Sequence, residues 1–154
     1  MNLQAYTDPA NLPASQTSRI ARLLAIDGPD TLSEVQLARR VSDGLRPRAA
    51  AALSDVLGRN RVVGPIIPEA TLRRTRKAGK PLSRELSERL YEVGRVVDAV
   101  SVVYHGDRQR IDAFLNRPHP MLEMETPFDL ARSSSAGAQA VLNLVRRIEA
   151  SMVL

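Results

Sequence analysis

Apolar residues recur at spacings of three and four positions along the stretch from Leu82 to Tyr104. This spacing is typical of an α-helix with one buried face. Elsewhere in the chain no segment keeps up the alternation of apolar and polar residues that marks a half-buried strand. Proline falls between the periodic segments, where it begins or ends helices. We therefore expect an all-α protein.

Capping and breaking residues divide the chain into eight or nine expected helices. Gly58 closes an alanine-rich helix, Gly79 ends a basic one, and Asp107 and Thr126 cap two later ones. The first expected helix begins at Ser18 and is stopped by Gly28-Pro29, and a capping box at residues 31–34 opens the second, which ends at Gly44. The next runs from a first-turn Pro47 to Gly58, and further helices are expected at residues 59–63, 68–78 and 82–104, after Asp107, after Thr126 and after residues 133–135. Residues 1–17 lack a periodic apolar face and are expected to be a flexible N-terminal arm. We expect about two lobes, divided near residue 80.

The excess positive charge is confined to one short window. The formal net charge is +5, and residues 61–80 hold six basic side chains against one acidic side chain. This window therefore accounts for the whole excess. In the helix expected at 68–78, four cations fall on one half of the helical wheel: Arg73, Arg74, Arg76 and Lys77. Such a local cluster indicates a defined anion-binding face.

A helix-turn-helix is the functional interpretation of this window. Residues 59–63 would form its first helix and residues 68–78 its recognition helix. Side chains near the start of the second helix would contact base edges, and the other cations would contact phosphates. The predicted DNA-binding residues are Arg61, Glu69, Thr71, Arg73, Arg74, Arg76, Lys77 and Lys80. The alternative is a solvated basic helix end, which the helix dipole favours in any case.

Residue types that carry catalysis or bind metals are scarce. The chain has no cysteine and two histidines, His105 and His119, neither with a catalytic partner at useful spacing. Gly79-Lys80-Pro81 lacks the upstream glycine and the hydroxyl residue of a phosphate-binding loop. We expect no enzymatic activity, no catalytic residues, no metal site and no cofactor.

The sequence also predicts where in the cell the protein is located. No run of about 18 apolar residues occurs, so we expect no membrane span. The first residues lack the basic and apolar stretches of a signal peptide, and cysteine is absent. We therefore expect a cytoplasmic protein.

Three stretches of the chain, residues 68–83, 82–122 and 126–149, resemble a known family. The most specific motifs are Ser87-Glu88-Arg89-Leu90, the turn Asn116-Arg117-Pro118, and Thr126-Pro127 followed by a helix that ends in Arg146-Arg147-Ile148-Glu149. In their order and spacing they resemble the Xre/MbcA/ParS antitoxins, which are partners of RES-domain toxins. The resemblance covers roughly residues 44–154.

This resemblance implies an Xre-like helix-turn-helix region at residues 18–80 and a helical toxin-binding domain at residues 81–154. It implies a toxin that resembles ADP-ribosyltransferases and uses NAD. The C-terminal segment of the antitoxin would block the toxin's active site, and the complex would repress its own operon. Carried onto this chain, the toxin-binding residues are Arg147, Glu149, Ala150, Ser151, Met152, Val153 and Leu154.

A second interpretation stays open. The basic window fits equally well a free-standing helix-turn-helix transcriptional regulator whose C-terminal lobe only dimerises. The partners expected from the leading interpretation are a RES-domain toxin and operator DNA. The expected assembly is a homodimer or a higher toxin–antitoxin hetero-oligomer.

Overall fold

The computed structural model describes residues 2–153, with side chains up to Met152. It confirms the all-α fold class, because no strand forms in that range apart from one isolated bridge between Val63 and Ile67. The α-helices are α1 (Gln16–Leu23), α2 (Glu34–Asp43), α3 (Arg48–Leu57), α4 (Arg59–Val62), α5 (Glu69–Ala78), α6 (Arg84–Val103), α7 (Arg108–Asn116), α8 (Pro127–Ser133) and α9 (Ser135–Val153). The described residues also form the short 3-10 helices η1 (Leu3–Thr7), η2 (Pro29–Thr31) and η3 (Pro120–Leu122).

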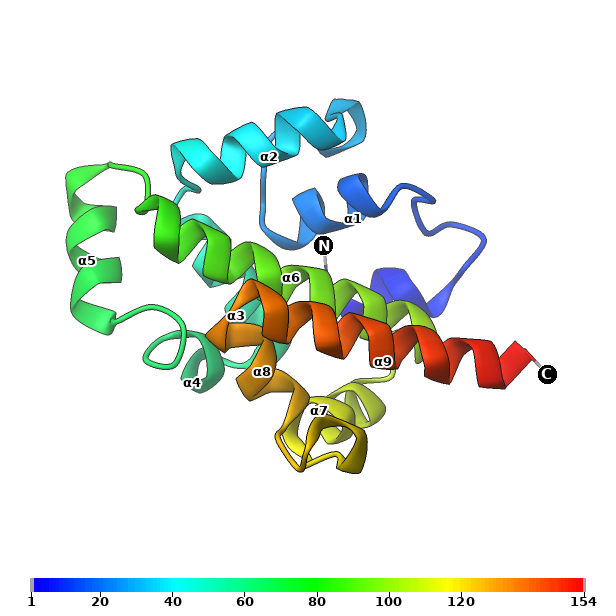
Figure 1. Ribbon diagram of the computed structural model, residues 1–154. Helices are drawn as coiled ribbons and strands as arrows, with labels where there is room; N and C mark the ends of the chain where they lie inside the picture. Colours follow the sequence, from blue (N-terminus) through cyan, green and yellow to red (C-terminus); the bar gives the residue numbers. More distant parts are fainter. Residues whose placement is uncertain (1, 154) are drawn as a thin grey trace.

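Helix α6 is the centre of the fold. Its Leu90, Val93, Val97 and Val100 are buried, as their spacing predicts. Figure 1 shows α9 alongside α6, with α1 and α2 on one side of this pair and α7 and α8 on the other. Helix α6 therefore contacts helices from both halves of the chain.

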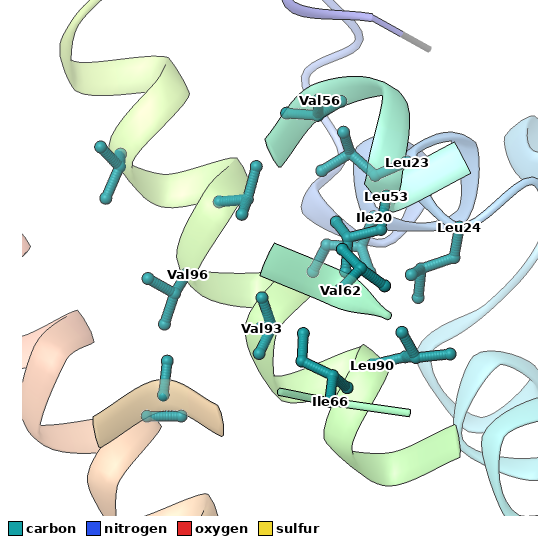
Figure 2. Packing of buried hydrophobic residues seen from close by; sticks show 14 of the residues in the cluster. Ile20, Leu23, Leu24, Leu53, Val56, Val62, Ile66, Leu90, Val93 and Val96 are labelled. Atoms are coloured by element: carbon teal, nitrogen blue, oxygen red, sulfur yellow. The ribbon is translucent and has the colours of Figure 1, made fainter. Parts of the chain in front are cut away.

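The buried apolar side chains form one continuous cluster. In Figure 2, Leu24, Leu53 and Val62 from the N-terminal half pack close to Leu90 and Val93 of α6. The expected boundary near residue 80 is thus not a boundary of the hydrophobic core. Apolar side chains from before and after residue 80 pack together in this one cluster.

The N-terminal segment differs from the flexible arm expected of residues 1–17. Leu3 and Tyr6 of η1 are buried, and the Tyr6 hydroxyl donates a hydrogen bond to Asp98 Oδ1 at 2.8 Å. The acceptor lies 92 residues further along the chain. Local composition carries no signal for so distant a contact, and this is why the sequence predicts an arm here.

Several helix ends agree with the predicted cap residues, but the predicted capping box of α2 is wrong by two positions, because Ser33 and Gln36 form it and Thr31 belongs to η2. Asp107 and Thr126 accept backbone hydrogen bonds at the starts of α7 and α8. Gly79 ends α5 with φ of 65°, a left-handed conformation that suits glycine. Helix α1 is displaced from its expected range, because Ser15 caps its start and Ala25 adopts φ of 52° shortly after its end.

Candidate functional sites

Helix α5 stands at the edge of the molecule and shows most of its surface (Figure 1). Within α5, Leu72 is buried, while Thr71 and Thr75 are half-buried on the same side. The Thr75 hydroxyl donates a hydrogen bond to the Thr71 carbonyl at 2.7 Å, so its polar group is paired within α5. One short apolar face therefore holds the helix, and the other side chains reach solvent.

The cations of this window form what we call the basic face: Arg73, Arg74, Arg76, Lys77 and Lys80. All five are exposed, and among the described residues none has a hydrogen-bond or ion-pair partner for its side chain. On α6 the situation differs, since Arg84 pairs with Glu88 at 3.0 Å and Arg89 with Glu85 at 3.1 Å. The charge of the basic face is left uncompensated and is available to an anion.

Three other predicted DNA-binding residues contact the protein itself. Glu69 Oε1 accepts a hydrogen bond from Arg59 Nη2 at 3.2 Å, which links the start of α5 to α4. The Arg61 guanidinium lies 5.6 Å from the centre of the Phe128 ring, a cation–π contact with α8. The third, Thr71, is half-buried. These three side chains are less free to reach DNA than the basic face.

The segment before α5 has a compact geometry. Helix α4 spans Arg59–Val62, a single turn, and is followed by a loop with buried Ile66 and Ile67. In the loop, the Gly64 amide donates to the Ile67 carbonyl at 2.7 Å. The two expected helices occur in the expected order, but the first is one turn long. The helix-turn-helix stays a prediction.

The C-terminal flank of α5 is tied to the loop between α2 and α3. The Leu82 amide donates to the Leu45 carbonyl at 2.8 Å, and the Leu45 amide donates to Ser87 Oγ at 2.8 Å. Arg46 Nη1 donates to the Gly79 carbonyl at 3.3 Å. At Gly44 a Cβ atom would lie 2.3 Å from the Leu82 carbonyl oxygen, so only glycine fits. These contacts fix where the basic face points.

The end of α9 carries the predicted toxin-binding residues. Arg147, Glu149, Ala150, Ser151 and Met152 are exposed, and the Met152 side chain is 57% exposed. Figure 1 shows this end of α9 extending past the end of α6. The Val153 side chain and Leu154 lie outside the described residues. The structure thus brings the described members of the set together on one projecting helix end.

A buried polar cluster joins η1, α1 and α6. Asp98 is 1% exposed and accepts hydrogen bonds from the Tyr6 hydroxyl and from Arg19 Nε, each at 2.8 Å. Burial, together with the Asp98 carboxylate, raises the pKa of Tyr6 above its ordinary value. Burial opposes the charge of Arg19, but the hydrogen bond and charge of Asp98 outweigh it and raise the pKa of Arg19. The cluster is fully paired and fixes the N-terminal segment to α6.

The two histidines have separate surroundings. His119 Nδ1 accepts a hydrogen bond from the Met121 amide at 3.1 Å, and His105 is exposed with φ of 52° at the end of α6. Among the described residues, no group of three or more metal-ligating side chains is close enough to hold an ion. No helix in the described part of the chain is long and apolar enough to cross a membrane.

The geometry defines a class: an all-helical protein with an exposed basic helix and a projecting C-terminal helix. Comparison with known families indicates which kind of helical protein this is. Residues 98–150 match the family model of the antitoxin Xre/MbcA/ParS C-terminal toxin-binding domain. This match supports an antitoxin of the Xre/MbcA/ParS type, as the resemblance in the sequence implies. No curated protein matches the chain.

The matched segment runs from the middle of α6 to near the end of α9. It contains Asp98 and the exposed residues Arg147, Glu149 and Ala150. Helix α5 and its basic face lie outside it. The match therefore bears on the toxin-binding part of the protein, and a toxin partner follows from it.

Proposed function

We propose that this protein is an antitoxin that neutralises a RES-domain toxin by covering the toxin's NAD-using active site with its C-terminal segment. The match of residues 98–150 to an antitoxin toxin-binding domain carries the proposal. The exposed end of α9 supports it, because a projecting helix end fits into a cleft that a flat surface cannot enter. The proposed role is that of a cytoplasmic binding protein without enzymatic activity.

Exposed charges on the same helix end support the choice of the C-terminal segment. Neither the Arg147 side chain nor the Glu149 carboxylate has a hydrogen-bond or ion-pair partner among the described residues. A site that binds the NAD phosphates contains cationic groups, and a carboxylate such as Glu149 pairs with them. Inhibition by direct coverage is stoichiometric, so the ratio of antitoxin to toxin sets the outcome.

Deletion of residues 150–154 tests this proposal. Because these residues lie beyond the α9 side chains that pack in the core, the shortened protein keeps its fold. We expect it to leave NAD consumption by a purified RES-domain toxin uninhibited, whereas the full chain stops it. A shortened protein that folds and still inhibits fully would contradict coverage by this segment.

We further propose that the protein binds operator DNA through the basic face and represses its own operon, with residues 18–80 as the DNA-binding region. The uncompensated cations of α5 support this part. A dimer, or a hetero-oligomer with the toxin, would present two such helices to successive turns of the duplex. The test is binding of the promoter fragment against random DNA of equal length, with preference for the promoter as the expected result.

The basic face also fits the second candidate, a free-standing transcriptional regulator. DNA binding alone does not separate the two candidates, because both need the same helix. A stable complex with a RES-domain toxin in high salt separates them. Sequence-specific DNA binding without any toxin complex would favour the regulator.

A further inference from the structure

A recess lies between the end of α6, α7 and α9, beside the C-terminal end of α9. Its volume is about 390 Å³, enough for one or two side chains of another protein. Its walls include three rings, two guanidinium groups and one aliphatic side chain: Tyr104, Phe114, His119, Arg110, Arg117 and Ile148. Tertiary packing brings these residues together from separate elements.

The rings form a continuous aromatic wall. The Tyr104 and Phe114 ring centres are 6.2 Å apart, and those of Phe114 and His119 are 6.5 Å apart, with tilted planes in both pairs. These separations are typical of favourable aromatic pairs. The His119 ring is also held by the Met121 amide, which donates to Nδ1 at 3.1 Å. The wall is therefore preformed and presents an apolar surface to a partner.

The charge of the recess is of one sign. Arg110 and Arg117 line it, and no carboxylate among the described residues does. Arg117 is exposed and has no ion-pair partner among the described residues, while Arg110 reaches Asp107 only at 3.8 Å. Guanidinium groups beside an aromatic wall recognise a carboxylate next to an apolar or aromatic side chain.

We propose that this recess docks the toxin by receiving an acidic residue, flanked by an apolar or aromatic one, from the toxin's surface. This inference rests on the proposed antitoxin function. Ile148 lines the recess and lies about one helical turn before Met152 at the exposed end of α9. A protein seated on the end of α9 therefore reaches the recess in the same contact.

Docking and inhibition then belong to different parts of one interface. The recess holds the toxin, and the C-terminal segment covers its active site. Variants of the recess weaken binding but inhibit completely at saturation. Deletion of the C-terminal segment leaves much of the binding in place and removes inhibition.

Two substitutions test the recess. Arg117→Glu reverses its charge, and Ala113→Tyr places a ring inside it, because Ala113 also lines the cavity. Matched controls are Arg39→Glu, an exposed arginine of α2 without a partner among the described residues, and Ala51→Tyr, an exposed alanine of α3. Thermal melting checks that all four variants fold.

The probe is a purified RES-domain toxin, titrated by calorimetry against each variant and against the unchanged protein. We expect each recess variant to bind at least about tenfold more weakly and each control to stay within about twofold of the unchanged protein. Folded recess variants that bind like the unchanged protein would overturn the inference. The proposed function would still stand if deletion of 150–154 abolished inhibition. If the unchanged protein bound no RES-domain toxin, the proposed function would fail first and the inference with it.

Discussion

At the scale of single residues, two helical glycines have opposite surroundings. A Cβ atom at Gly94 would lie 3.5 Å from Leu24 Cδ2, an ordinary contact, whereas at Gly137 it would lie 2.2 Å from the Leu130 carbonyl oxygen. Glycine inside a helix costs about 0.5–1 kcal/mol relative to alanine. We expect Gly94→Ala to raise the free energy of unfolding by about that amount. Gly137→Ala should lower it by about 1–3 kcal/mol. Urea unfolding measures both, and a destabilised Gly94→Ala variant would contradict the ordinary contact between Leu24 and a Cβ atom at position 94.

Tyr6 makes the stability of the fold depend on alkaline pH. Its pKa is raised from the ordinary 10.0 by burial and by Asp98, so the folded protein keeps a proton that the unfolded chain loses. The contribution of Tyr6 to the free energy of unfolding is therefore fully present below pH 10. It is lost as the pH rises above 10, by up to about 1.4 kcal/mol per pH unit. Tyr6→Phe should cost about 1–3 kcal/mol at pH 7 and make the alkaline fall shallower. Burial also raises the pKa of Tyr91, so Tyr91 adds the same alkaline loss of stability to the variant and to the unchanged protein. An unchanged alkaline slope in the variant would count against the buried hydrogen bond.

At the scale of elements, the basic face of α5 makes a prediction about salt. A phosphate contact through Lys77 releases counterions, so Lys77→Ala should weaken binding to all sequences alike and reduce the salt slope by about one unit. Arg73 lies nearer the start of the helix, and Arg73→Ala should relax base preference at one position by about 1–3 kcal/mol. Arg117→Ala, an exposed arginine at the end of α7 and outside residues 18–80, is the control. Fluorescence anisotropy with promoter and random duplexes separates these effects. Identical salt slopes for the Lys77 variant and the unchanged protein would remove α5 from the contact.

Individual helices can be predicted from the sequence, whereas contacts between separate helices cannot. The spacing of Leu90, Val93 and Val97 predicts α6 because helical periodicity is a local property. Pro68 and Gly79 bound α5 for the same reason, since caps act on their own backbone. The aromatic wall around Phe114 cannot be predicted in this way, because its rings come from separate elements. The toxin-binding residues at the end of α9 rest on the family resemblance alone, because no local pattern marks them, and they stay a prediction.

At the scale of the whole molecule, α6 joins the two regions that the sequence predicts. Its buried Leu90 and Val93 pack with residues from before position 80, and its Val96 and Val100 belong to the same cluster. The Leu82 amide and Ser87 hydroxyl tie the flank of α5 to the loop at Leu45. If the proposed toxin binds at α9, the shared core predicts that it also stabilises the helices that carry the basic face.

This shared core predicts that residues 81–154 do not fold alone. In that fragment, α6 would expose the apolar side that α1, α2 and α3 cover in the whole chain. We expect the fragment to keep helical circular dichroism, to bind a hydrophobic dye and to lack a cooperative thermal transition. The whole chain should unfold in one transition seen equally by circular dichroism and by calorimetry. A fragment that melts cooperatively would instead establish residues 81–154 as an independent domain, and the basic helix would then be free to move relative to the toxin-binding surface.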